Sequence, residues 1–232
     1  MKGKGIIMGV LALAIVGLVV AIYSSVMKPV RFEQDFYTRR DACALKLKTI
    51  RVLEEQYKLT YGKYCGDFDT LVNRLLTEDS LHIRQKQINY DVIPEDVSVN
   101  DMLESEAIKR GYIKYEEVYV NPIAQLREQK KLDYTDANGA VKTFTDQELK
   151  NLCYIPYPKG TTEKFQLEAG TIVNNGFNVP VFECKIDLKT LMSDLDDQLV
   201  RNKIAEIERV SSKYAGWKVG DMTQAITDGN FE

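Results

Sequence analysis

The most constraining feature of the sequence is an uncharged apolar run near its beginning. After MKGKG, the chain has no charged residue from Ile6 to Met27. As a helix that rises about 1.5 Å per residue, this run is long enough to cross a hydrocarbon core of roughly 30 Å. The apolar region of a cleaved signal peptide usually spans only about 7–15 residues and ends at an A-x-A-like site, which does not follow here. We therefore predict an uncleaved transmembrane helix over residues 6–27.

The charges that flank this run give its orientation only a weak bias. Two lysines and the amino terminus precede the run, whereas four basic residues follow it: Lys28, Arg31, Arg39 and Arg40. Counting positive charges alone mildly favours the reverse topology. The N-terminal flank is short, however, and a bulky domain after a first span is commonly exported whatever its nearby charges. We expect residues 1–5 in the cytoplasm and residues 28–232 exported, with the lipid bilayer as a partner.

The overall charge argues against nucleic acid as a partner. The chain has 31 lysines and arginines against 34 aspartates and glutamates, a net charge of −3, and no basic block outside the juxtamembrane stretch. Nucleic-acid-binding proteins usually concentrate positive charge on one face or along one helix.

A helical apolar pattern continues beyond the predicted span, over residues 32–61. One apolar seam recurs every seven residues at Phe36, Cys43, Ile50 and Tyr57, with Leu47 and Tyr61 between these positions. A second apolar seam lies beside the first and consists of Leu45, Val52 and Leu59. So broad a face is typical of a helix packed across a sheet or bundle, whereas a two-stranded coiled coil has a narrow seam. Gly62 is placed to stop this helix in a left-handed turn, and Asp67 or Asp69 can cap a short helix after it.

The stretch LKTIRVLEEQYKLTYGKYCGDFDTL, together with the apolar run before it, resembles the first helix and following turn of type IV pilins and type II secretion pseudopilins. The resemblance covers residues 1–75, and it implies a short basic leader that is cleaved between Gly5 and Ile6. The sequence departs from that family at Val10, because the family carries a glutamate at this fifth position after the leader glycine. Both outcomes, a cleaved and a retained leader, therefore stay open.

The whole chain also resembles uncharacterised single-pass envelope proteins of Gram-negative bacteria that begin with the same helix and turn. That resemblance implies a location in the inner membrane with the bulk of the chain in the periplasm. It implies no activity.

Residues 66–190 combine strand-like and helical patterns. Two extended pairs surround Asn138-Gly139 and Asn175-Gly176, which are strong hairpin signals, and Pro180 indicates an edge or near-edge strand. Ser98 can cap a short helix that ends at Gly111. A C-terminal helix is expected over residues 193–214, and Trp217 in the tail is expected to pack against the domain. The fold class predicted is α+β, with a small antiparallel sheet of hairpins between two helices.

The four cysteines have no C-x-x-C spacing, and His82 is the only histidine, so a zinc site would need an unusual set of ligands. Cys43 and Cys65 lie at the two ends of a predicted helical stretch, which would hold them some 28 Å apart. Cys153 and Cys184 lie in separate strand-like runs, and a disulfide between them would stabilise the fold by about 3–4 kcal/mol. We predict that pair, with buried reduced thiols as the alternative.

No residue pattern predicts a reaction. His82 lies in a strand-like run, where an isolated histidine is usually exposed or hydrogen-bonded, and the chain has no G-x-S-x-G, H-E-x-x-H or Walker sequence. The acidic run Ser193, Asp194, Asp196 and Asp197 fits the first turn of a helix better than a calcium site. Three glutamates of the long helix, Glu33, Glu54 and Glu55, are interpreted as a solvated face. We expect no enzyme activity, no cofactor and no metal.

Gly5 and Gly9 fit the small-xxx-small pattern that lets membrane helices approach closely, so a homo-oligomer is possible through this face. Two functions follow from the sequence. The first is a membrane-anchored periplasmic scaffold or assembly protein that binds other envelope proteins, as part of a secretion or pilus-like machine. The second is a pseudopilin-like structural subunit of a short fibre.

Overall fold

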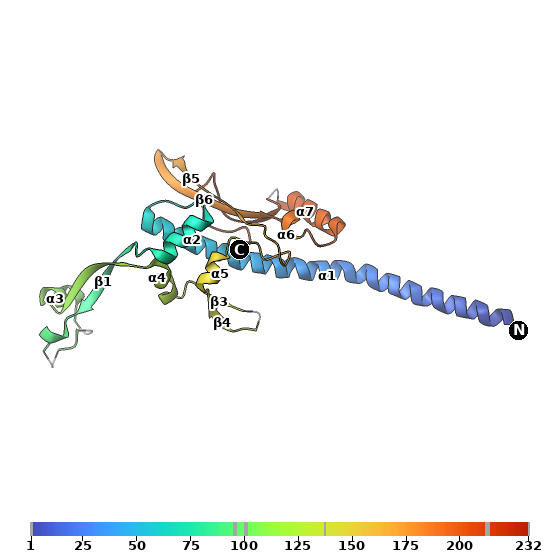
Figure 1. Ribbon diagram of the computed structural model, residues 1–232, viewed down its shortest axis with the longest axis horizontal. Coiled ribbons are helices and arrows are strands. Elements are labelled where there is room, and N and C mark those ends of the chain that lie inside the picture. The colour runs from blue at the N-terminus through green and yellow to red at the C-terminus, as the bar shows by residue number, and fades with distance from the viewer. Residues whose placement is uncertain (1, 95–96, 100–101, 137, 212–213, 232) are drawn as a thin grey trace.

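The chain forms a mixed α+β structure that begins with one long helix, and the other helices and strands come after it in the sequence (Figure 1). The computed structural model describes residues 2–94, 97–99, 102–136, 138–211 and 214–231, with the backbone alone for residues 2–7, 12 and 211. The helices are α1 (Lys2–Tyr61), α2 (Phe68–Thr77), the 3-10 helix η1 (Tyr90–Val92), α3 (Glu104–Lys109), α4 (Pro122–Glu128), α5 (Asp146–Lys150), α6 (Leu188–Leu191) and α7 (Asp197–Ser211). The strands are β1 (Leu81–Ile88), β2 (Ile113–Val120), β3 (Asp133–Thr135), β4 (Val141–Thr143), β5 (Gln166–Asn174), β6 (Phe177–Asp187) and β7 (Gly216–Gly220).

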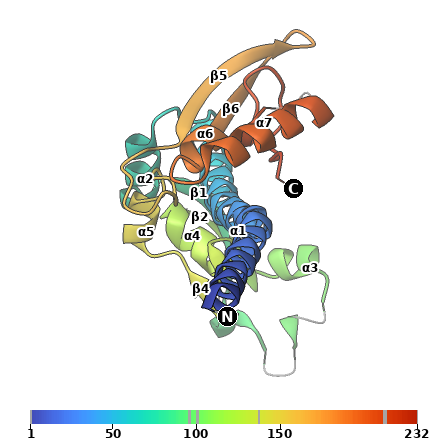
Figure 2. The same cartoon turned by 90° about the vertical axis from the view of Figure 1, so that its right-hand side faces the viewer.

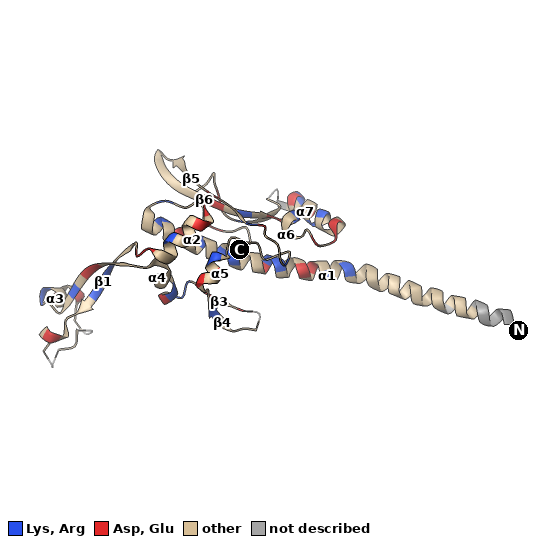
Figure 3. Ribbon diagram, in the orientation of Figure 1, with Lys and Arg blue, Asp and Glu red and all other residues tan. Residues whose placement is uncertain are grey.

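Helix α1 contains both the predicted transmembrane segment and the predicted amphipathic helix in one run of 60 residues, which continues through Pro29. Its first part projects away from the rest of the molecule, and the described part of this projection is coloured in Figure 3 as free of charged residues. The large apolar side chains there, from Met8 to Val26, are exposed. Among the described residues, this is the one helix long and apolar enough to cross a membrane.

The second part of α1 is the central helix of the domain, and the other elements lie on several sides of it (Figure 2). The predicted main seam is buried at Phe36, Cys43, Leu47, Ile50 and Tyr57. These side chains join the principal hydrophobic core with residues from α2, α4, α5, β6, α6 and β7. The prediction that this helix packs into a core is therefore confirmed. The second seam is only partly covered, and its predicted member Leu59 is 70% exposed.

Three separate antiparallel sheets take the place of the single small sheet expected from the sequence: β1-β2, β3-β4 and β5-β6-β7. The hairpin signal at Asn175-Gly176 is confirmed, because both residues adopt the positive φ values of a type I′ turn, 50° and 83°. Asn138-Gly139 likewise lies between the paired strands β3 and β4. Strand β6 is central in its sheet, yet β7 pairs only with Glu183–Asp187, so Pro180 lies where one edge of β6 is open.

The C-terminal region differs from the expected single helix over residues 193–214. Helix α7 begins at Asp197, and the tail contributes the third strand of the largest sheet, β7, which the sequence analysis missed. Trp217 of β7 packs against Phe36 of α1 with 5.8 Å between ring centroids, as expected for an aromatic side chain that fixes the tail to the domain. The predicted cap at Ser98 is wrong, because α3 starts after Leu103.

Candidate functional site

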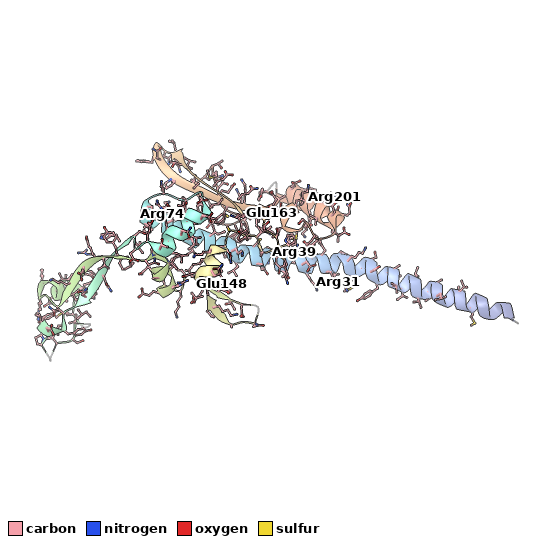
Figure 4. All side chains as sticks on the ribbon, in the orientation of Figure 1. Arg31, Arg39, Arg74, Glu148, Glu163 and Arg201 are labelled. Atoms are coloured by element: carbon pink, nitrogen blue, oxygen red, sulfur yellow. The ribbon has the colours of Figure 1, made fainter. Side chains whose placement is uncertain are left out.

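Just beyond the apolar part of α1, a group of contacts holds α7 and β7 against it. Arg39 is buried and forms a bidentate ion pair with Asp194, in which Nη2 of Arg39 lies 2.8 Å from Oδ2 of Asp194. Its guanidinium also donates to the carbonyl of Leu191 at 2.8 Å and lies 4.9 Å from the ring centroid of Tyr157. Figure 4 labels Arg39 on α1 next to the domain, with Arg31 closer to the apolar projection. We call this group, together with the contacts in the next paragraph, the membrane-proximal clamp.

The remaining contacts of the membrane-proximal clamp come from α7 and β7. Lys203 of α7 lies 3.0 Å from the carboxylate of Glu33, and its ammonium also stands 5.0 Å from the ring centroid of Phe36. Trp217 contacts the same phenyl ring from β7. The hydrogen bond from Arg39 lowers the pKa of Asp194. Burial acts to lower the pKa of Lys203, but its hydrogen bonds to Glu33 and Glu206 outweigh burial, so the pKa of Lys203 is raised. Side chains from α7, from β7 and from the segment before α7 thus hold the domain against α1 within a few turns of its apolar part.

The acidic run at the start of α7 has structural roles. Asp196 accepts hydrogen bonds from the backbone N–H groups of Gln198 and Leu199, and Asp197 pairs with Arg201 one turn later at 2.7 Å. Asp196 thus caps the helix, as predicted, whereas the Asp197–Arg201 contact is an ion pair between side chains one turn apart. The pairing of Asp194 with Arg39 was not predicted, because two residues so far apart in sequence carry no joint signal.

The prediction that Glu54 lies on a solvated face of α1 is wrong. Its side chain is fully buried, and its Oε2 accepts a hydrogen bond of 2.8 Å from the backbone N–H of Cys65. Its Oε1 has no hydrogen-bond partner among the described residues. Burial raises the pKa of this carboxyl to about 8. By contrast Glu55 is exposed, and Glu33 is partly buried and paired with Lys203.

The turn after α1 confirms Gly62 as the helix stop. Gly62 has a φ of +74° and its N–H donates to the carbonyl of Lys58 at 2.8 Å, a left-handed ending that glycine adopts most easily. Asp67 then caps α2 by accepting from the N–H of Thr70. Two tyrosines of this turn region, Tyr57 and Tyr64, are buried.

The predicted disulfide between Cys153 and Cys184 is wrong for this structure, in which all four cysteines are free and buried. Cys184 points from the central strand β6 into the core, where Glu54 and Cys43 are its electrostatic neighbours, whereas Cys153 follows α5 and lies near Lys46 and Lys164. Burial raises the pKa of Cys43 to about 12 and that of Cys184 well above its ordinary value. These thiols are therefore protonated, and a thiolate is what nucleophilic attack or metal binding requires.

His82 lies on β1 with half of its side chain exposed, 3.4 Å from Glu117 and with its ring against Tyr119. Its position in a strand agrees with the prediction. Within the described ranges, no group of three or more histidine, cysteine, aspartate or glutamate side chains is placed to hold a metal ion.

The glycines of the apolar run leave the packing prediction open. A side chain at Gly9 would meet nothing within 4 Å, so this face of α1 is uncovered in the monomer. Gly5 and Ile6 lie within α1, but the surroundings of their side chains fall outside the described part of the chain. Whether the leader is cleaved there stays a prediction.

Comparison of the chain with protein-family models, with curated proteins and with solved structures finds no match.

Proposed function

We propose that this protein is a non-enzymatic membrane-anchored scaffold or assembly protein of the bacterial envelope. In this proposal α1 spans the inner membrane, and the domain stands in the periplasm and binds other envelope proteins, as part of a secretion or pilus-like machine. The observation that carries the proposal is α1 itself, which is exposed and apolar over its first part and buried in the domain core over its second. One uninterrupted helix thus serves as both membrane anchor and core element.

The membrane-proximal clamp supports a mechanical role for this helix. No linker separates the apolar part of α1 from the domain, and Arg39, Lys203 and Trp217 fix neighbouring elements to α1 soon after the apolar part ends. A flexible tether would let a domain swing freely, whereas a continuous helix transmits its direction. An anchored domain of this kind would present its surfaces at a fixed height and angle above the bilayer.

Two projecting ribbons support a binding role. The β1-β2 pair carries α3 at the end of the molecule opposite the N-terminus, and the tip of the β5-β6 pair extends beyond β7 (Figure 1). Exposed apolar side chains lie on both, including Tyr119 on β2 and Val173 and Phe177 at the tip of β5-β6. Exposed aromatic and aliphatic side chains of this kind are common anchors in protein–protein interfaces.

The cysteine and histidine side chains, which are the types best suited to catalysis, are not placed as catalytic groups among the described residues. The thiols of Cys43 and Cys184 are buried and protonated, and His82 stands on an exposed ribbon beside Glu117. This arrangement favours binding over catalysis as the role of the domain.

A pseudopilin-like subunit of a short fibre is the second candidate. It is favoured by the long helix with a glycine-stopped turn and by the sheet β5-β6-β7 that packs against the second part of α1. In this alternative, residues 1–5 are removed and the chain begins at Ile6.

The intact mass of the protein extracted from native membranes separates the two candidates. A scaffold keeps Met1–Gly5, whereas a processed subunit loses the mass of these residues. Chemical crosslinking in native envelopes then tests the scaffold directly. Recovery of a reproducible set of envelope proteins supports it, and recovery of a ladder of this chain alone contradicts it in favour of a fibre.

A further inference from the structure

A groove runs along the second part of α1, on a surface that the membrane-proximal clamp does not use. It consists of two cavities of about 590 and 400 Å³, which share Gln56, Leu59 and Lys131 as lining residues. The first cavity is closed by Leu126 of α4 and by the tail at Thr227 and Asp228. The second is bounded by α4 and by the start of β1. We call these joined cavities the α1–β1 groove.

Gln56 gives the α1–β1 groove an unused hydrogen-bonding group. The residue is only 7% exposed, it lines both cavities, and its Nε2 has no hydrogen-bond partner among the described residues. A buried polar group without a partner is unfavourable, so a ligand toward which the Gln56 side chain turns gains by accepting the hydrogen bond of this amide. Gln125 and Gln129 of α4 bring two more side-chain amides to the second cavity. Amides both donate and accept, as the peptide groups of an extended chain do.

Strand β1 gives the same groove an unpaired edge. Its sheet contains β1 and β2 alone among the described strands, so the other edge of β1 carries backbone groups with no strand partner. Leu81, His82 and Ile83 line the second cavity, and none of its lining residues comes from β2. The groove therefore lies on the side of β1 away from β2. An added strand at such an edge gains main-chain hydrogen bonds, which is a common mode of peptide recognition.

The charge of the second cavity indicates what kind of chain would fit. Its lining residues include Lys131 but no carboxylate. The carboxylates of the groove, Glu55 and Asp228, line the first cavity, and no ion pair of either with Lys131 is present among the described residues. Leu59, which is 70% exposed, supplies an apolar wall shared by both cavities. An acidic side chain on the ligand would find its complement at this end of the groove.

We propose that the α1–β1 groove binds an extended polypeptide segment of a partner protein. The segment pairs with the open edge of β1, accepts a hydrogen bond from Gln56 and places an acidic side chain near Lys131. This proposal rests on the scaffold function, and it deepens that function by naming the chemistry of the partner.

The test uses the full chain in nanodiscs and a random dodecapeptide library displayed on phage, first depleted on empty nanodiscs. A synthetic peptide of the most enriched sequence is labelled and titrated by fluorescence anisotropy. We expect acidic sequences that bind the wild type and lose about tenfold or more in affinity for Leu59→Trp, which fills the groove. Val141→Trp places the same side chain at an equally exposed position on β4 and should bind like the wild type.

Two further variants examine the chemistry without blocking the groove. Gln56→Leu removes the amide at similar size and should weaken binding by about fivefold to tenfold, the value of one hydrogen bond. Lys131→Glu should weaken acidic peptides by a similar factor. Bound peptide should also slow hydrogen exchange at residues 81–83 and leave residues 141–143 unchanged.

Failure to enrich any peptide above empty nanodiscs, or equal affinity for Leu59→Trp and the wild type, would overturn the proposal. Enriched sequences that match strands of this chain would assign the groove to a second copy and overturn it as well. Both faces of a nanodisc are accessible, so these results do not depend on which way the chain crosses a membrane. A lack of peptide binding at the α1–β1 groove therefore leaves the proposed anchoring role standing. The opposite membrane orientation, in turn, leaves peptide binding unchanged.

Discussion

Replacing Glu54 by glutamine should make the stability of the domain less dependent on pH. Glu54 is fully buried in α1, with one carboxyl oxygen bonded to the N–H of Cys65 and the other without a partner among the described residues. Its pKa is raised by burial from 4.5 to about 8, so the folded protein holds it neutral at pH 7. Glutamine has the same shape, can accept the same hydrogen bond and carries no charge at any pH.

The magnitude follows from the difference between the two pKa values. A change from 4.5 to about 8 corresponds to about 4–5 kcal/mol at about 1.4 kcal/mol per pKa unit. Because the folded state binds this proton more tightly than the unfolded state, the stabilisation is fully present below pH 4.5 and is lost as the pH rises toward 8. Between these limits the wild type should lose about 1.4 kcal/mol per pH unit relative to Glu54→Gln.

Urea unfolding of the full chain in nanodiscs measures this difference. The fluorescence of Trp217, the only tryptophan, reports on the contact between β7 and α1. Unfolding free energies at pH 5, 6, 7 and 8 should diverge steadily between the wild type and Glu54→Gln. Glu55→Gln, a change at the exposed neighbour, should follow the wild type at every pH. Parallel pH profiles for the wild type and Glu54→Gln would refute the assignment of a buried neutral carboxyl.

Three other predictions follow from the same structure. Gly62→Val should lower stability by about 1–2 kcal/mol, because a β-branched residue is strained at a φ of +74°, and a thermal melt that matches that of Glu55→Lys would contradict this. Asp194→Asn leaves the buried Arg39 without a counter-charge and should cost about 1–3 kcal/mol in urea unfolding, whereas Asp197→Asn, in an exposed pair, should cost less than about 0.5 kcal/mol; equal losses would count against the membrane-proximal clamp. The four thiols should resist a water-soluble thiol reagent until the protein is unfolded, and a Cys153–Cys184 linked peptide in a non-reducing map would show that the thiol assignment is wrong.

The parts of the fold that could be predicted are those with a strong local signal. The uncharged run from Ile6 to Met27 and the seven-residue seam after it fix α1, and Gly62 marks its end. Asn175-Gly176 gives a tight turn whatever surrounds it, because few residues other than these adopt two successive left-handed conformations. Such features depend on a few neighbouring residues, and neighbouring residues are what a single sequence displays.

The features that could not be predicted depend on contacts between distant segments. Glu54 lies beside the apolar seam, and only the approach of the turn at Cys65 buries it. Arg39 was counted as a membrane-flanking charge, and nothing local reveals that Asp194 comes to meet it. Strand β7 is short and bounded by glycines, so its pattern is weak until β6 is beside it. The groove at Gln56 likewise exists only where α1, α4 and β1 converge.

Cysteine labelling at one exposed position tests the proposal that α1 spans the inner membrane and that the domain lies in the periplasm. The native cysteines are buried, so Val141→Cys, at a position 70% exposed, adds a single accessible thiol. Bacteria that express this variant are treated with a membrane-impermeant maleimide after permeabilisation of the outer membrane alone, and the labelled protein is followed through urea-washed membranes. We expect labelling before the inner membrane is broken, with the protein retained in the membrane fraction. Labelling only after the inner membrane is lysed, or release of the protein by the urea wash, would contradict it.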